Sequence, residues 1–314
     1  MTNSDLSICV VAQILLRACR ISPGAASALL LKAPVDQMVD ELDLIEWCES
    51  QGMPRDKVGD EAALAFSKKS ISETVEAGID VIPVTSDHYP VHLKLIEDAP
   101  PVIYSKGNRE LLSAKPGVSV VGTRKASPNG LRIAERIAGY FAERQWTIVS
   151  GLALGIDAAA HRGALGVSGA TVAVLAHGLH HATPKANAHL ANDILANGGA
   201  WVSEHPINVP ALPEQFVQRN RIQIGLSAGS IIVEGEERSG TMTQAEFCLR
   251  NRRQLFAVLP EKADELKLVS KGPLILINRR GATPLRSRDD YESAAHLMEV
   301  KRAMLASLPL TSSS

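Results

Sequence analysis

Several short segments of the chain combine glycine with hydroxyl side chains, a composition suited to holding an anion. The residues concerned are Gly122, Thr123, Ser150, Gly151, Gly155, Ser239, Gly240 and Thr241. Glycine lets the backbone approach a ligand closely, and the free N–H groups at the start of a helix attract a phosphate. Each segment follows a run of apolar residues and precedes a stretch of helical periodicity. We therefore predict that these residues form a phosphate pocket.

Cationic, amide and aromatic side chains lie in or near the same loops. They are Arg124, Lys185, Phe216, Arg219, Asn220 and Arg221. A guanidinium can contact a phosphate through two parallel hydrogen bonds, and an aromatic ring offers a surface on which a base can stack. These residues are predicted to contact nucleic acid. A solvated turn at Arg124 and a helix that buries Phe216 in the core are alternatives that the sequence leaves open.

Asp157 and His161 are separated by one helical turn. Asp157 is a suitable N-cap for a helix that begins there, and the histidine is within reach of its carboxylate. We expect this pair to cap the helix rather than to contact a ligand. The histidines between residues 177 and 189 are not combined with cysteine or a carboxylate at the spacing of metal ligands. No metal, cofactor or catalytic residue is predicted.

The segments that must position these loops alternate between strand and helix. The predicted strands are 118–121, 147–149, 171–175, 200–203, 230–233 and 255–258, and the predicted helices are 131–144, 157–165, 186–196, 215–226 and 243–251. Short apolar strands between amphipathic helices are typical of a parallel sheet covered on both faces. We therefore predict an α/β fold with a doubly wound, mostly parallel sheet, whose ligands bind beyond the carboxyl ends of the strands. Residues 81–84 and 100–104 are further extended runs, and 274–277 are predicted as an edge strand.

Changes in sequence pattern divide the chain into three parts. Residues 1–75 have apolar side chains at helical spacing and are predicted to form a small N-terminal helical domain. Residues 76–288 form the predicted Rossmann-like domain, and residues 289–314 a C-terminal helix with a frayed tail. With 45% apolar residues the chain can bury a core, but its net charge is only −1. A nucleic acid would have to be held by a local basic patch.

Cysteine usage and the N-terminal segment indicate the compartment. Cys9, Cys19, Cys48 and Cys248 have no disulfide or metal-binding spacing, which is typical of reduced thiols. The first apolar run is short and is interrupted by Gln13, so it fits neither a signal peptide nor a membrane span. We expect a cytoplasmic protein without membrane contact.

Seven motifs follow one another along the chain. They are Asp87-His88-Tyr89-Pro90, Gly122-Thr123-Arg124, the segment from Ser150 to Asp157, the loop from Gly178 to Asn187, Ser203-Glu204-His205-Pro206, Arg219-Asn220-Arg221 and Ser239-Gly240-Thr241. In this order they resemble the DprA/Smf family of DNA-processing proteins, over residues 78–290. One departure is Thr183-Pro184, where the family usually has Tyr-Pro.

The resemblance implies an extended Rossmann-like fold that binds single-stranded DNA without sequence preference. It also implies that the protein protects this DNA and helps load RecA recombinase in natural transformation or recombination. By the same resemblance the protein would act as a homodimer and not as an enzyme. We expect no winged-helix domain of the kind that many members carry.

Two other functions fit part of the pattern. A nucleotide N-glycosidase of the LOG type uses the motif PGGxGTxxE, and Gly240-Thr241 resembles its GT pair. Gln244, however, stands where the carboxylate is needed, and Glu246 would point to another face of the helix. A sensor of a small nucleotide could use the same phosphate pockets. We favour DNA, because arginines spread over several loops suit a polymer.

Overall fold

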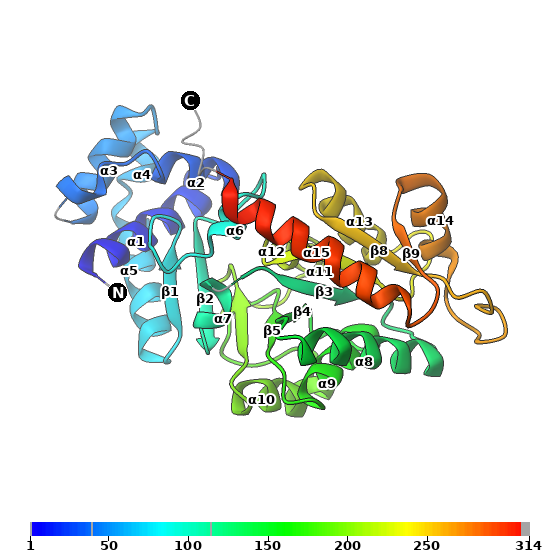
Figure 1. Cartoon of the computed structure of the whole chain (residues 1–314). Coiled ribbons are helices and arrows are strands. Elements are labelled where there is room, and N and C mark those ends of the chain that lie inside the picture. Colours follow the sequence, from blue (N-terminus) through cyan, green and yellow to red (C-terminus); the bar gives the residue numbers. More distant parts are fainter. Residues whose placement is uncertain (1, 39, 114, 309–314) are drawn as a thin grey trace.

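The computed structural model describes residues 2–38, 40–113 and 115–308, and at its centre lies a nine-stranded sheet with the order β1-β2-β6-β5-β4-β3-β7-β8-β9 (Figure 1). The strands are β1 (Asp80–Pro83), β2 (Val102–Gly107), β3 (Gly117–Val121), β4 (Ile148–Ser150), β5 (Thr171–Val174), β6 (Ala200–Ser203), β7 (Ser227–Ile232), β8 (Gln254–Val258) and β9 (Thr283–Leu285). β2 pairs antiparallel with β1 and β6, and the remaining neighbours pair in parallel. The predicted doubly wound, mostly parallel α/β fold is confirmed.

Helices connect these strands and precede the sheet. In chain order they are α1 (Asn3–Arg17), α2 (Pro23–Leu30), η1 (Val35–Gln37), α3 (Glu41–Ser50), α4 (Arg55–Val58), α5 (Glu61–Glu76), α6 (Val91–Lys94), α7 (Glu110–Ser113), α8 (Pro128–Glu143), α9 (Ile156–Leu165), η2 (Lys185–Asn187), α10 (Ala188–Ala196), α11 (Pro213–Gln218), α12 (Asn220–Gly225), α13 (Gly240–Arg250), α14 (Lys271–Arg280) and α15 (Asp290–Ser307). None of the described helices has both the length and the apolar character needed to cross a lipid bilayer.

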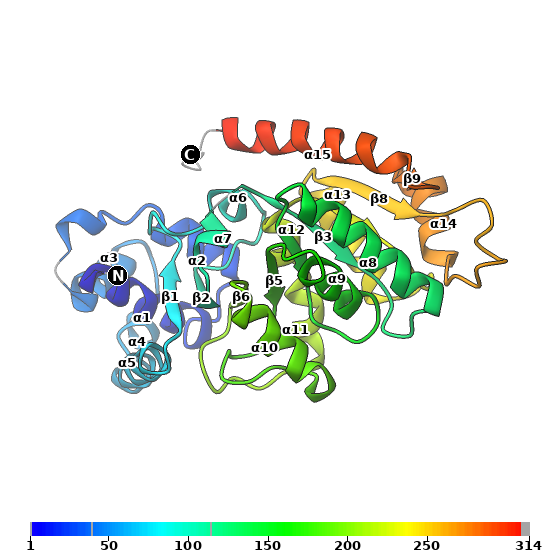
Figure 2. The same cartoon turned by 60° about the horizontal axis from the view of Figure 1, so that its bottom comes forward.

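Both faces of the sheet are covered, as the alternation of side chains along β7 and β8 requires. Ile231 and Phe256 pack into one cluster with residues of α8, α9 and α15, whereas Ile232 and Ala257 pack into another with residues of α13 and α14. Successive strand residues point to opposite faces, so each strand contributes to two cores. Figure 2 shows α15 running along β8 toward the N-terminal helices.

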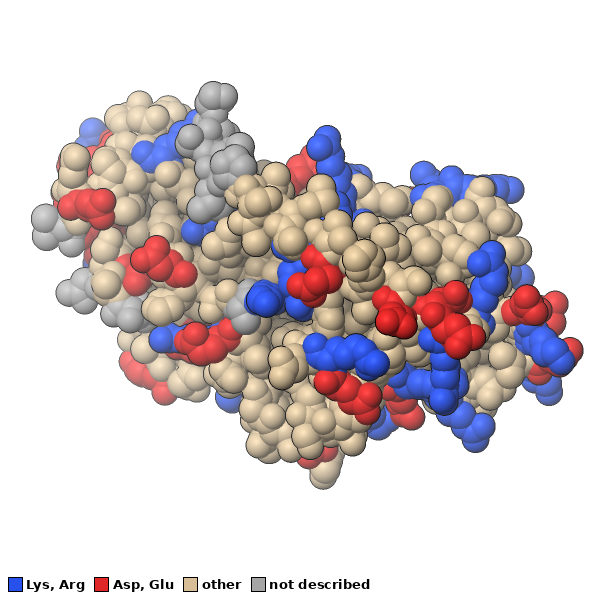
Figure 3. All heavy atoms as spheres, viewed as in Figure 1, with Lys and Arg blue, Asp and Glu red and all other residues tan. Residues whose placement is uncertain are grey.

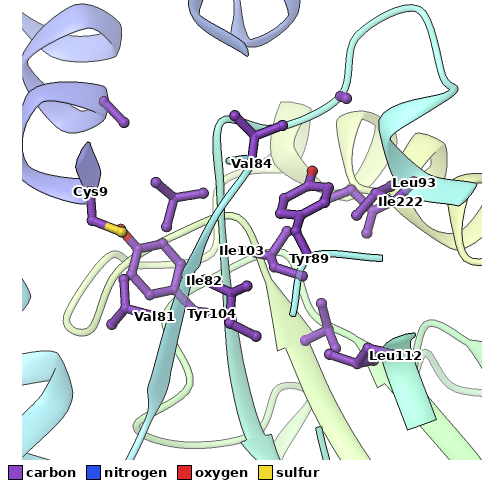
Figure 4. Close-up of a cluster of buried hydrophobic side chains, with 14 of the residues drawn as sticks. Cys9, Val81, Ile82, Val84, Tyr89, Leu93, Ile103, Tyr104, Leu112 and Ile222 are labelled. Atoms are coloured by element: carbon purple, nitrogen blue, oxygen red, sulfur yellow. The ribbon is translucent and has the colours of Figure 1, made fainter. Parts of the chain in front are cut away.

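The N-terminal helices share a core with the antiparallel end of the sheet. Buried residues of α1 belong to the same cluster as those of β1 and β2, and Cys9 points toward Tyr104 (Figure 4). The buried hydroxyl of Tyr104 accepts a hydrogen bond of 3.0 Å from the Nε2 group of Gln13. Residues 1–75 contain the predicted helices, and α5 ends at Glu76, next to the predicted domain boundary. The division into domains stays a prediction.

Two predicted elements differ from the structure. Residues 274–277 are not an edge strand but part of α14, because only Leu276 of this apolar run is fully buried while Leu274 is 45% exposed. Gly281 ends that helix in the left-handed region at φ 72°, and β9 follows as the edge strand. The predicted helix at 215–226 is divided into α11 and α12 at Arg219. The tail predicted to fray, at the end of 289–314, lies outside the described residues.

Glu234, at the end of β7, fixes the start of α8. Its fully buried carboxylate accepts hydrogen bonds from the backbone N–H of Ser127 (2.9 Å), the Ser127 hydroxyl (2.7 Å) and the backbone N–H of Val269 (2.8 Å). Ser127 in turn caps α8 by accepting from the N–H of Gly130 at 2.9 Å. A Cβ at Gly130 would overlap the carboxylate, so glycine is required there. This cluster holds the loop after β3 against the end of β7.

We expect Glu234→Ala to lower the free energy of unfolding by about 2–3 kcal/mol, because it leaves three donors without their charged acceptor. Urea unfolding followed by circular dichroism measures this loss. Glu236→Ala is the matched control, since Glu236 is exposed two residues away, and its effect should stay within about 0.5 kcal/mol. Equal losses in both variants would contradict the role assigned to Glu234.

Candidate functional site

A cavity of about 520 Å³ lies at the carboxyl ends of β3 and β7. The strand order reverses between these two strands, since β4, β5 and β6 continue on one side of β3 and β8 and β9 on the other side of β7. Such a switch point leaves a crevice outside the sheet where ligands of open α/β folds bind. The walls are the loop after β3, the start of α9, helices α11 and α12, and the start of α13.

Arg124 and Phe216 lie together on the wall of this cavity. The Arg124 guanidinium carbon is 5.2 Å from the centroid of the Phe216 ring, a cation–π contact between the loop after β3 and α11. Arg124 is exposed and forms no ion pair with any described residue. Phe216 is half-buried and lines the cavity, so it is not a core residue. The two side chains present a cation and an aromatic surface to the same space.

Arg219 forms the inner part of the cavity, and its position depends on Gly151. Its side chain is only 5% exposed, and Nη2 donates to the carbonyl of Gly151 at 3.1 Å. A Cβ at Gly151 would overlap the guanidinium. Glycine is therefore needed here for packing against Arg219. Burial lowers the pKa of Arg219, and the charge of Asp157, whose Oδ2 is 3.9 Å from Nη2, opposes this effect. Nε and Nη1 of Arg219 have no hydrogen-bond partner within the described part of the chain.

Asp157 is not the helix cap that the sequence predicts. Helix α9 is preceded by Gly155 at φ 80°, and the Asp157 carboxylate accepts a 3.1 Å hydrogen bond from the backbone N–H of Gly151. Burial raises the pKa of this carboxyl, while Arg219 and backbone N–H groups act in the opposite direction. His161 does not bond Asp157 either, because its Nδ1 lies 2.7 Å from the hydroxyl of Thr171. Asp157 is instead the counter-charge of Arg219.

Three amide side chains complete the cavity wall. Asn220 donates from Nδ2 to the carbonyl of Gly240 at 3.4 Å, and Gln223 donates from Nε2 to Asn220 Oδ1 at 3.1 Å. Gln244 lies in α13 and donates to the hydroxyl of Ser119 at 3.2 Å. Asn220 was predicted as a contact residue, whereas Gln223 and Gln244 were not. The sequence held a signal for Gln223, which is a polar residue flanked by two isoleucines.

The predicted phosphate pocket is brought together only in part. Gly122, Thr123, Ser239, Gly240 and Thr241 line the cavity, and Gly240 has open space around it. The exposed Glu236 and Glu237 are not among its lining residues.

Ser150 and Gly155 support the structure instead of lining the cavity. The buried Ser150 hydroxyl donates to the carbonyl of Val120 at 2.8 Å, within the sheet. A Cβ at Gly155 would overlap the carbonyl of Thr123, so this glycine permits the close approach of two loops. These positions do not match the prediction that both residues belong to a phosphate pocket.

Lys185 lies outside the cavity, in η2 of the loop that follows β5. It is exposed, and the same loop is tied to the loop after β4 because Asn187 Nδ2 donates to the carbonyl of Leu152 at 2.8 Å. Lys185 therefore lies at the carboxyl edge of the sheet, two strands away from β3. In the described part of the chain, no group of three or more His, Cys, Asp or Glu side chains is arranged to hold a metal ion.

The prediction that Arg221 contacts nucleic acid is wrong, because its side chain is buried in an ion pair. Its side chain is 3% exposed and donates to both carboxylate oxygens of Glu204 at 2.6 Å and to the carbonyl of Asp98 at 2.8 Å. Burial alone would raise the pKa of Glu204, but the charge and hydrogen bonds of Arg221 outweigh it and hold this pKa below its ordinary value. This ion pair occupies the guanidinium and joins α12 to the end of β6.

Fold and site together define a Rossmann-like α/β protein with a cavity at the switch point of its sheet. The chain belongs to the family of the DNA recombination-mediator protein A, DprA/Smf, whose sequence profile matches residues 80–296. The DNA processing protein DprA of Bacillus subtilis is 38% identical over 215 residues, which cover 68% of this chain and 71% of that protein. Protein Smf of Escherichia coli is 39% identical over 199 residues, 62% of this chain and 53% of that protein.

Solved structures agree with this assignment. The DprA structure from Streptococcus pneumoniae has a TM-score of 0.76 at 32% identity and covers 93% of this chain and 98% of its own. DNA processing protein A from Helicobacter pylori, whose structure concerns its single-stranded DNA binding mode, has a TM-score of 0.62 at 25% identity. That match covers 69% of this chain and 96% of the Helicobacter chain.

The buried ion pair between Arg221 and Glu204 is expected to stabilise the folded protein. We expect Arg221→Ala to destabilise the protein by about 3–5 kcal/mol at pH 7, since it leaves a buried carboxylate without its counter-charge. Stability from a carboxyl with a lowered pKa is present above the unfolded pKa and is lost as the pH falls through the folded pKa. In the variant the charge of Arg221 no longer opposes burial, so the pKa of Glu204 rises and this carboxyl takes up a proton at a higher pH than in the parent. The difference in stability between parent and variant should therefore narrow as the pH is lowered from 7 toward 4, in urea unfolding experiments. A difference independent of pH would contradict the ion pair.

Proposed function

We propose that this protein binds single-stranded DNA in the cavity between β3 and β7, and that it acts by binding rather than by catalysis. The observation that carries the proposal is the pair of Arg124 and Phe216 on the cavity wall. An unpaired guanidinium can bind a phosphate, while the aromatic ring beside it can stack on a base. Thr123 and the open backbone at Gly240 add hydrogen-bonding groups for phosphate oxygens.

The distribution of positive charge supports a polymer and not a single nucleotide. Arg124 and Arg219 lie at the cavity, and the exposed Lys185 lies further along the same edge of the sheet. A strand that leaves the cavity across β4 and β5 would reach Lys185. On the face shown in Figure 3, acidic and basic side chains are interspersed. Binding to DNA is also supported by the Helicobacter relative, whose structure concerns that ligand.

The side chains of the cavity argue against the N-glycosidase alternative. Gln244 occupies the position of the required carboxylate, and Glu246 is exposed and lies 3.8 Å from Arg280. Asp157 lines the cavity, but its carboxylate is held by a backbone N–H and faces Arg219. A group with these partners is poorly suited to stabilise a developing positive charge on a sugar.

Membership in the family supports a proposal for the role of the protein in the cell. We propose that the protein protects single-stranded DNA, helps load RecA recombinase onto it in natural transformation or recombination, and works as a homodimer. Its cysteines Cys9, Cys19, Cys48 and Cys248 are free thiols, which suits the cytoplasm, where DNA and RecA meet.

Arg124→Ala should weaken binding of single-stranded DNA at least tenfold. A charge-assisted hydrogen bond contributes about 1.5–3 kcal/mol, and about 1.4 kcal/mol is a factor of ten. Stability should change by no more than about 0.5 kcal/mol, because the side chain is exposed. Fluorescence anisotropy and thermal melts measure the two effects. Arg124→Lys should recover only part of the affinity, since an ammonium cannot form the paired contact.

Arg144→Ala is the matched control for Arg124→Ala. Arg144 also rests on an aromatic ring, with its guanidinium carbon 3.6 Å from the centroid of Tyr140, but it does not line the cavity. Its removal should leave DNA affinity unchanged. If both variants lost affinity equally, general electrostatic attraction would explain binding and the cavity would not be the site.

The affinity for single-stranded DNA should fall as salt is added. If Arg124 and Lys185 each neutralise one phosphate, the slope of log affinity against log salt is about −1.4. The titration is repeated with a duplex and with mononucleotides at one salt concentration. A slope near zero, or tighter binding of the duplex, would refute the single-strand proposal, and tight binding of a mononucleotide alone would favour a nucleotide sensor.

A further inference from the structure

A group of histidine side chains lies in the loop that follows β5, outside the cavity. Two of them form what we define as the imidazole pair, His180 and His181, whose ring centroids are 4.2 Å apart in an edge-to-face contact. Both residues are exposed. The buried His177 stacks against His181 with 5.2 Å between the ring centroids and the ring planes 17° apart. The imidazole pair is therefore an exposed aromatic surface that a buried ring supports.

The loop that carries the imidazole pair is attached to the loops on both sides of it. The backbone N–H of Gly178 donates to the carbonyl of Val209, in the loop after β6, at 3.0 Å. A Cβ at Gly178 would overlap the carbonyl of Pro206, so glycine is required for this approach. In the other direction, Asn187 joins the loop to the segment after β4. The imidazole pair thus has a defined position at the same edge of the sheet as the cavity.

The hydrogen bonds of the two rings decide which of them can accept a proton. The backbone N–H of Asn208 can only donate, so Nδ1 of His180 accepts from it at 3.2 Å and the neutral ring carries its proton on Nε2. A second proton on His180 would place two donors opposite each other. His181 forms no hydrogen bond or ion pair with any described residue. Its ring can therefore take up a proton without losing a partner.

The rings next to His181 favour a single charge in this group. Burial lowers the pKa of His180, and the charge of His181 acts in the same direction, against the backbone of Gly178. Burial is also the main cause of the lowered pKa of His177, whose Nδ1 donates to the carbonyl of Gly178 at 2.8 Å. Both rings stay neutral while His181 is charged.

The loop after β6 gives this charge no partner. Burial lowers the pKa of His205, Glu204 opposes this effect, and the charge of Arg221 adds to it. The Glu204 carboxylate is already bound through both oxygens by the Arg221 guanidinium. Since His181 has no ion pair with a described carboxylate, its positive charge is left to a ligand.

We propose that the imidazole pair is a second contact for single-stranded DNA, in which protonated His181 and the Nε2–H group of His180 bind a phosphate. This inference rests on the proposed binding of single-stranded DNA at the cavity. Neighbouring strands are about 4.8 Å apart, so the end of β5 lies roughly 10 Å from the end of β3. A DNA strand that leaves the cavity across β4 therefore reaches this loop. The contact is made to the phosphate, so it is independent of base sequence, and it strengthens as the pH falls and His181 gains its charge.

The test measures the affinity of the protein for oligo-dT at pH 8 and at pH 6, by fluorescence anisotropy at several salt concentrations. Thymine does not titrate in this range, whereas an ordinary imidazole does. The parent should bind about two- to fivefold more tightly at pH 6, the range of one solvent-exposed ion pair. The slope of log affinity against log salt should also be steeper at pH 6, by up to about 0.7.

Three variants assign the effect to one side chain. His181→Gln should remove the pH dependence. His181→Lys carries its charge at both pH values and should bind at pH 8 about as tightly as the parent does at pH 6. His189→Gln is the matched control, because His189 is an exposed histidine of α10 whose Nδ1 lies 2.8 Å from the carboxylate of Asp193. A charge there is already paired, so this variant should keep the ratio of the parent.

The outcomes separate this contact from the cavity. Equal affinity of the parent at both pH values would overturn the contact at the imidazole pair and leave single-strand binding at the cavity intact. A pH dependence that persists in His181→Gln, or that is lost in His189→Gln, would overturn the assignment to His181. Failure of the parent to bind oligo-dT at either pH would refute the proposed function itself and this inference with it.

Discussion

The packing of the Arg219 guanidinium against Gly151 is the contact on which the cavity depends. It brings the junction of α11 and α12 onto the loop after β4, and no side chain larger than hydrogen fits between them. A buried guanidinium is costly unless it is paired, and Asp157 supplies the opposite charge. Asp157 is itself held by the backbone N–H of Gly151, so the glycine positions both members of the pair. Loop, helix and counter-charge thus form one unit behind the cavity.

Two arginines only two positions apart have different roles because residues i and i+2 of a helix do not share a face. Arg221 points away from the cavity and is saturated by Glu204 and Asp98. Arg219 points toward it and keeps two nitrogens unpaired. The ion pair of Arg221 fastens α12 to the end of β6 and to the loop before β2. It thereby holds α12, which begins directly after Arg219.

The fold could be predicted from local pattern because apolar strands and amphipathic helices alternate along the chain. The strand at 200–203 has the predicted bounds. β7 begins earlier than predicted. The prediction missed Ser227, Ala228 and Gly229 because they lack the bulky apolar side chains of a typical strand. The cavity position also followed, since loops after parallel strands meet at one edge. The role of Arg221 could not be predicted, because its partners Glu204 and Asp98 are 17 and 123 residues away in the sequence. Gln223 was missed because a polar residue between two isoleucines does not by itself show that its side chain will line a cavity after folding.

A chain with a net charge of −1 can still attract a polyanion, because its charges are not equally available. Near the cavity, Glu204 neutralises Arg221, Asp157 faces Arg219, and Glu234 is surrounded by donors from Ser127 and Val269. These carboxylates are buried, and their charges are offset by the arginines and hydrogen-bond donors that surround them. Arg124 forms no ion pair among the described residues and lies at the cavity surface. Folding thus pairs these three acids inside the protein and leaves the charge of Arg124 exposed at the cavity, where the proposed ligand would meet it.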